Sequence, residues 1–170
     1  MKTGRPPLWN PVATLSETTW TEVVPVTSKS RVQLPVSARV RLNWGPLTEP
    51  LPLLAKLEPG NSAKLEPWDP AGVAVMRELE TLLASEGDAN RAELALIAMD
   101  RYLRVSLDPD GRILLPANLA HHIHAIGHDA VRVIVRRGDL QLWSEIKWQA
   151  NRSSRLRAFG DRLLRLEGSH

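Results

Sequence analysis

Cysteine is absent from the 170 residues, so disulfide bonds and thiolate metal sites are excluded. The sequence also lacks any run of about 18 apolar residues, the length that a membrane-spanning helix needs. Its first twenty residues contain no continuous apolar stretch of the kind found in secretory signals. These absences lead us to expect a soluble cytoplasmic protein with no membrane partner.

The motifs of common enzyme classes are missing as well. The chain has no G-x-S-x-G nucleophile elbow, no P-loop and no glycine-rich dinucleotide turn. Asp108 and Asp110 stand close together, but the turn that contains them explains both. We therefore expect a protein that is not an enzyme and uses no cofactor.

Phenylalanine and tyrosine are scarce, with one residue of each, whereas tryptophan occurs six times. Trp68, Trp143 and Trp148 are expected to pack under the fold, although an exposed tryptophan could also stack on a nucleic-acid base. Trp9 and Trp20 could anchor the N-terminal region onto a neighbouring subunit.

Charge is unevenly spread along a chain whose net charge is only +3. Residues 58–100 contain nine acids and three bases, a balance of −6, whereas residues 145–166 contain six bases and two acids, a balance of +4. Residues 29–41 contain no acid and four bases, Lys29, Arg31, Arg39 and Arg41. Such segregation fits a polyanionic partner, an oligomer whose subunits present opposite signs, or an ordinary solvated surface.

Residue periodicity and turn signals predict the elements of the first half. Residues 1–18 contain three prolines and are expected to form a flexible arm. Strands are predicted at 21–26 and from 31 to Pro35, followed by a short helix at 36–42 and by strands near 51–57 and 63–68. Two helices follow, with Asp69 and Asp88 as N-caps and Gly87 as a stop signal.

The second half returns to strands. They are predicted around 103–108 and 112–116, followed by a short helix at 117–127 and by two strands joined at residues 137–139. Ser144 is expected to cap a basic amphipathic helix that closes the chain. This helix could pack on the body of the protein, bind the DNA backbone, bind an acidic partner or lie on an anionic membrane.

The two halves repeat each other. The segment SRVQLP at 30–35 matches GRILLP at 111–116, and the order of predicted elements around both segments is the same. A duplication within one chain implies two similar half-domains packed about a pseudo-twofold axis.

A strong turn signal precedes the second copy of this phrase. Asp108, Pro109 and Gly111 occupy the positions that a type I turn prefers. Asp108 and Arg112 flank the turn, where a carboxylate and a guanidinium could form a bidentate pair. The pair could simply lock the hairpin, or Asp108 could orient Arg112 toward a phosphate or a base edge.

The segments LDPDGRILLPANL and LQLWSEIKW resemble the MraZ branch of the AbrB-like swapped-hairpin proteins, over about residues 20–150. Those are bacterial DNA-binding transcription regulators with a D-x-x-x-R motif in each of two tandem half-domains. The second motif is intact here as Asp108 and Arg112. The first has Thr27 and Ser30 in place of the acid and the glycine, although Arg31 remains.

The resemblance implies an α+β, strand-rich fold with two tandem swapped-hairpin half-domains that form a pseudo-twofold double barrel. On this interpretation the arm at 1–18 precedes half-domains at 19–68 and 105–144, with a helical connector at 69–104 and a C-terminal helix at 145–170. The family also implies binding to repeated elements of double-stranded DNA by a homo-oligomer, possibly a ring. The DNA-binding residues would be Lys29, Arg31, Arg39, Arg41 and Arg112, with Asp108 and Gly111 shaping the second loop.

Four histidines lie close together in the sequence and could indicate a metal-binding site. His124 and His128 are four residues apart, but no cysteine or well-spaced carboxylate completes a site, and Gly127 is expected to end the helix between them. We expect exposed helix histidines at 121, 122, 124 and 128 rather than metal ligands.

Two functions follow from these features. The first is a sequence-specific DNA-binding transcriptional regulator located with the nucleoid. The second is a protein-interaction module of the same fold, antitoxin-like or scaffolding, in which DNA binding is weakened or lost. The altered motif at Thr27 and Ser30 is the feature that favours the second.

Overall fold

The computed structural model describes residues 19–126 and 130–168. Eight strands form one antiparallel sheet in the order β1-β7-β8-β4-β3-β5-β6-β2. The edge strands β1 and β2 follow each other in the chain and meet at a bridge between Val26 and Val32, so the sheet nearly closes into a barrel. The strands are β1 (Thr19–Pro25), β2 (Arg31–Gln33), β3 (Leu51–Glu58), β4 (Ser62–Pro67), β5 (Tyr102–Leu107), β6 (Arg112–Leu114), β7 (Ala130–Arg136) and β8 (Asp139–Ser144).

The predicted α+β, strand-rich class is confirmed. Side chains alternate between the inner and outer faces of this sheet: Leu140, Leu142 and Ser144 of β8 face inward and are buried, and the residues between them are partly exposed. The inward residues of all eight strands join with those of two short helices in one apolar core. These helices are α2 (Val36–Leu42), as predicted, and α5 (Ala117–His122).

The strand register reproduces the sequence repeat. Val32 pairs with Ile113, its own counterpart in the repeat, and the flanking pairs Arg31–Leu114 and Gln33–Arg112 exchange roles across it. Strand β1 of the first half pairs with β7 of the second, and β5 of the second half pairs with β3 of the first. Each half therefore completes the other, which makes the two copies of the phrase structurally interdependent.

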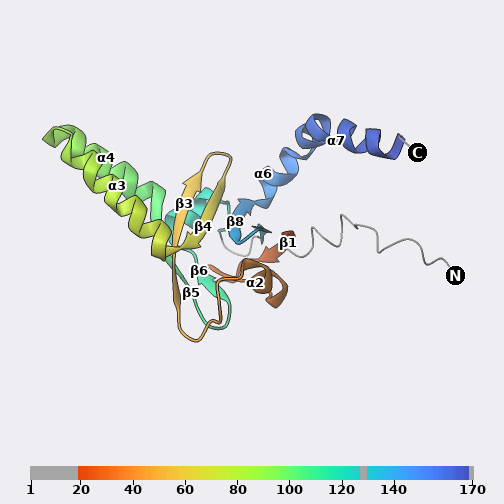
Figure 1. Cartoon of the computed structure of the whole chain (residues 1–170), viewed down its shortest axis with the longest axis horizontal. Helices are drawn as coiled ribbons and strands as arrows, with labels where there is room; N and C mark the ends of the chain where they lie inside the picture. The colour runs from red at the N-terminus through yellow and green to blue at the C-terminus, as the bar shows by residue number, and fades with distance from the viewer. Residues whose placement is uncertain (1–18, 127–129, 169–170) are drawn as a thin grey trace, which may run out of the picture.

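Two helices project from the sheet at one end of the molecule (Figure 1). They are α3 (Val73–Ala84) and α4 (Asp88–Arg101), and no residue of either is buried. The predicted caps are wrong: Asp69 lies in an irregular turn at Trp68–Gly72, and Gly87 occupies the N-cap position of α4 rather than ending the preceding helix. Asp88 is the first residue of α4 and pairs with Arg91.

The C-terminal region forms two helices, α6 (Glu145–Ala150) and α7 (Arg152–Gly168), instead of the single helical pattern expected. The Ser144 hydroxyl accepts a hydrogen bond from the amide of Lys147, which confirms this predicted N-cap. Helix α7 extends away from the sheet at the end of the molecule opposite to α3 and α4 (Figure 1). The expected arm at 1–18, including Trp9, lies outside the described residues.

Candidate nucleic-acid interface

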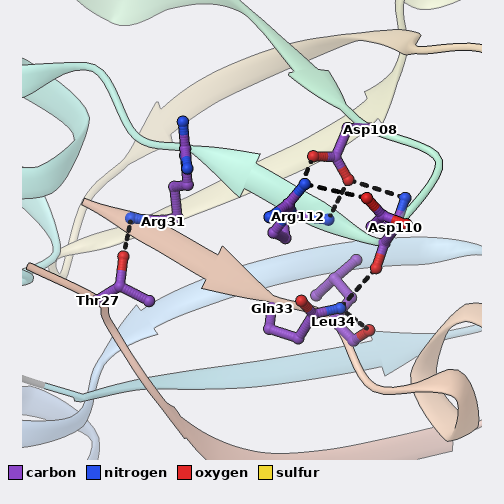
Figure 2. Close-up of polar contacts among 7 residues, drawn as sticks. All are labelled: Thr27, Arg31, Gln33, Leu34, Asp108, Asp110 and Arg112. Carbon is purple, nitrogen blue, oxygen red and sulfur yellow. Dashed lines mark hydrogen bonds and ion pairs between the residues drawn. The ribbon is translucent and has the colours of Figure 1, made fainter. Parts of the chain in front are cut away.

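Strands β2 and β6 run side by side and place the two repeated loops at one surface. Val32 and Ile113 point into the core and have no exposed area. Because side chains alternate along a strand, Arg31 and Arg112 both lie on the opposite, outer face. Figure 2 shows these two arginines on neighbouring strands.

The second loop is held together by Asp108. One carboxylate oxygen accepts hydrogen bonds from the amides of Asp110 and Arg112, each at 2.9 Å. The other oxygen lies 3.0 Å from Nε of Arg112. A second carboxylate, that of Asp110, lies 3.0 Å from another nitrogen of the same guanidinium (Figure 2).

Arg112 is therefore bound by two acids, and the predicted pair with Asp108 is present. Partial burial raises the pKa of Asp108, but hydrogen bonds from the backbone and side chain of Arg112, together with its charge, lower that pKa by more. The contact of Asp110 with Arg112 was not predicted from the sequence. The position of Asp110 two residues before Arg112 in a turn is the sequence signal that could have revealed it.

The backbone of the first loop has the same turn as that of the second, but the charged side chains of the two loops differ. Thr27 replaces the aspartate, and its hydroxyl accepts a hydrogen bond from the Arg31 amide at 3.2 Å (Figure 2). Ser30 adopts a positive φ of 58°, and Gly111, its counterpart, has a φ of 86°. In the part of the chain that the structure describes, no acid lies within ion-pair distance of Lys29 or Arg31.

A hollow of about 200 Å³ lies between the two loops and is basic. Its lining carries three positively charged side chains, together with hydroxyl and amide groups, all of which can donate hydrogen bonds to an anion. The lining residues are Thr27, Ser28, Lys29, Arg31, Gln33 and Arg112. This set can bind phosphate oxygens, since Lys and Arg together supply the charge and the donors that a phosphodiester requires.

Gln33 connects the two halves at this surface. Its side-chain amide donates to the backbone oxygen of Asp110 at 2.7 Å, which fixes the second loop against β2 (Figure 2). Sequence reasoning missed this residue because the contact joins positions 77 residues apart in the chain.

Arg39 lies beside the second loop rather than inside the hollow. Its Nε donates to the backbone oxygen of Leu34 at 3.1 Å, and a Cβ added to Gly111 would lie 2.7 Å from that Nε. Gly111 therefore serves both the turn and the packing of Arg39. In the repeat, the counterparts of Arg39 and Gly111 are Ala120 and Ser30, so one pair combines a large residue with glycine and the other pair combines two small residues.

Arg41 does not line the hollow, although the sequence groups it with the other bases. Its guanidinium donates to the backbone oxygen of Ser37, one turn earlier in α2, at 2.6 Å. The structure thus brings together Lys29, Arg31 and Arg112 and places Arg39 near them, but it does not add Arg41 to the same hollow.

The expectation of exposed helix histidines is wrong for two of the four. Helix α5 ends at His122, short of the predicted end. Nε2 of His122 lies 2.8 Å from the backbone oxygen of Glu58 and 2.9 Å from the backbone oxygen of Ser62. His124 is also partly buried, with Nδ1 2.7 Å from the Ser144 hydroxyl. The His122 ring joins the second half to the hairpin between β3 and β4 of the first, whereas the His124 ring contacts the end of β8 within its own half. His121 is exposed on α5, and His128 lies outside the described residues.

Among residues 19–126 and 130–168, no three histidine or acidic side chains cluster in a way that could hold a metal ion. No helix in those ranges has both the length and the apolar character needed to cross a bilayer. Neither a protein-family model nor a curated protein matches the chain.

Proposed function

We propose that this protein is a sequence-specific DNA-binding transcriptional regulator of the MraZ/AbrB type, located in the cytoplasm with the nucleoid. The observation that carries the proposal is the basic hollow between the two repeated loops, lined by Lys29, Arg31 and Arg112. Pairing of β1 with β7 and of β5 with β3 is the connectivity expected of two tandem swapped hairpins, and supports the same assignment.

Arg31 is the main DNA-binding residue in this proposal. Among residues 19–126 and 130–168, no acid lies within ion-pair distance of its guanidinium, so its charge is available to a phosphate or a guanine edge. Lys29 adds charge on the same loop. Arg112 contributes less, because two carboxylates already neutralise it. The first loop thus supplies most of the attraction to DNA, and the second loop holds the surface rigid.

The test is fluorescence anisotropy with a labelled duplex taken from upstream of the gene and with an unrelated duplex, across a salt series. We expect tighter binding to the upstream duplex and an affinity that falls with salt. Arg31→Ala should weaken binding about tenfold or more, the range that loss of one base-reading arginine gives. Arg112→Ala should weaken it less. Arg136→Ala, an exposed arginine on β7 outside the hollow, is the matched control.

Equal and weak binding to both duplexes, unchanged by Arg31→Ala, would reject the proposal. The second candidate would then stand, a protein-interaction module of the same fold. The observation that favours it is the charge of the second loop, where Asp108 and Asp110 outnumber Arg112 and would repel a phosphate backbone.

A further inference from the structure

Strand β5 has one edge that no other strand covers over most of its length. On one side β5 pairs with β3 from Tyr102 to Leu107. On the other side it pairs with β6 only where Leu107 lies opposite Ile113. In the part of the chain that the structure describes, no other strand lies along residues 102–106 on that second side. An open strand edge presents backbone donors and acceptors to which a further strand can bind.

The sequence after β6 explains why this edge stays open. If the antiparallel register of β5 and β6 continued beyond their one pair, Leu115 would lie opposite Val105. The Leu115 amide instead donates to the backbone oxygen of Ser30 in the first loop, at 2.8 Å. The next residue is Pro116, which has no amide hydrogen to donate. The two arms of the hairpin therefore separate, and the edge of β5 is left without a partner strand in the described ranges.

A groove of about 800 Å³ lies where the two arms separate, and we call it the β5 groove. Arg104 and Ser106 line it from β5, and Leu114 and Pro116 line it from the other arm. Lys29 of the first loop lines it as well. The groove thus runs along the open strand edge and is large enough for a ligand, since binding sites usually measure about 300–1,000 Å³.

The β5 groove is positively charged. Lys29 and Arg104 are exposed, and no acid is among the described residues that line the groove. Among residues 19–126 and 130–168, neither cation has an acid within ion-pair distance. The guanidinium of Arg104 lies 4.8 Å from the centre of the Trp68 ring, a contact that positions it at the groove. Two such cations favour a partner that brings carboxylates.

The alternation of side chains on β5 determines which strand would match it. Arg104 and Ser106 are exposed, whereas Val105 between them is buried in the core. Val105 and the buried Leu115 also line the β5 groove. A strand along this edge would place alternate side chains beside Arg104 on the outer face and beside Val105 on the inner face. The matching segment therefore alternates acidic and apolar residues.

We propose that the β5 groove binds an extended acidic segment of a partner protein, which adds a strand to the open edge of β5. Its carboxylates pair with Lys29 and Arg104, and its apolar side chains contact Val105 and Leu115. Backbone hydrogen bonds supply affinity, and the two cations select acidic segments. Lys29 lies at the border between this groove and the hollow between the two loops, but the groove does not depend on DNA binding.

Peptide binding to charge-reversed proteins tests the role of the two cations. The probe is a labelled peptide in which glutamate and valine alternate, and its fluorescence anisotropy is measured with the nuclease-treated full-length protein. We expect saturable binding to the parent. Lys29→Glu with Arg104→Glu should weaken it at least about tenfold, because two attractive pairs become repulsive. Arg77→Glu with Arg136→Glu makes the same change in net charge at exposed residues outside the groove and should leave the affinity unchanged.

Methylated peptides test strand addition on the parent protein, so this test does not depend on the folding of a variant. Methyl groups on the glutamate amides block one edge of the extended peptide, and methyl groups on the valine amides block the other. Only one edge faces β5, so one version should lose binding at least about tenfold and the other should keep it. Binding of the unmethylated peptide should also slow amide hydrogen exchange within residues 102–106.

A parent that does not bind the peptide would overturn the proposal. So would a charge-reversed protein that binds as the parent does, or equal binding of the two methylated peptides. If the peptide does not bind but Arg104→Glu weakens binding of a DNA duplex, the groove belongs to nucleic acid instead. A parent that binds the peptide and no duplex would support this proposal and reject the DNA-binding function, so the two can fail separately.

Discussion

The two loops of the repeat share a backbone but differ in how their charges are balanced. In both, the amide of the fourth residue donates to the carbonyl oxygen of the first at 2.9 Å, from Ser30 to Thr27 and from Gly111 to Asp108. The first loop pairs Arg31 with a neutral hydroxyl, whereas the second surrounds Arg112 with two carboxylates. The same loop backbone can therefore carry two different arrangements of charge.

The largest expected effect comes from making the second loop resemble the first at its glycine. Gly111→Ser places a side chain where φ is 86° and where Nε of Arg39 would lie 2.7 Å from the new Cβ. We expect the free energy of unfolding to fall by about 1–3 kcal/mol, the usual cost of such a backbone position. Denaturant unfolding measures this change.

Adding Arg39→Ala to that variant should recover part of the loss. The pair would then copy Ser30 and Ala120, the residues at the counterpart positions of the repeat. A Gly111→Ser protein as stable as the parent would show that the packing of Arg39 against the loop is loose in solution.

The second prediction makes the first loop resemble the second. Thr27→Asp places a carboxylate beside Arg31, in the position that Asp108 holds beside Arg112. If Arg31 binds DNA, the new ion pair should weaken binding about tenfold, equivalent to 1.4 kcal/mol, while the protein folds normally. Thr48→Asp, in an exposed loop, gives the same change in net charge and is the control for anisotropy measurements. Unchanged affinity would mean that Arg31 is not the DNA-binding residue.

Sequence reasoning predicted most of the strands, helix α2, the Ser144 cap and the ion pair of Asp108 with Arg112. These features depend on residues close together in the chain, where periodicity and turn preferences act. It did not predict the role of Gln33, the packing of Arg39 on Gly111, or the hydrogen bonds of His122, because these contacts join opposite halves. It also grouped Arg41 with Arg31 by charge alone, although a local contact with Ser37 directs Arg41 elsewhere.

The third prediction reduces the negative charge around Arg112. Asp110→Asn removes one of the two carboxylates that hold the guanidinium, while Asp108 still organises the turn. We expect DNA to bind about threefold more tightly at low salt, because an exposed ion pair contributes about 0.2–1 kcal/mol. The gain should vanish at high salt in the same anisotropy assay. Weaker binding would show that Asp110 positions Arg112 for DNA rather than competing with it.

The smallest effect is a pH dependence present only in the second loop. The pKa of Asp108 is lower in the folded chain than its ordinary value, because hydrogen bonds from Arg112 outweigh the effect of partial burial. Its ionised form therefore stabilises the fold above the ordinary carboxyl pKa of about 4, and this contribution is lost as the pH falls through the folded pKa.

The comparison of the parent with Asp108→Asn isolates that contribution. Glu145 also has a lowered pKa, caused first by its hydrogen bond from Arg132, but it is common to both proteins. The difference between their free energies of unfolding should be constant from pH 7 to about pH 5 and should shrink below about pH 4. A difference that persists unchanged to pH 3 would mean that the backbone hydrogen bonds to Asp108, which asparagine could partly retain, matter more than its charge. The first loop, with Thr27 in place of the acid, has no such carboxylate to titrate, so its contribution to stability should be independent of pH across this range.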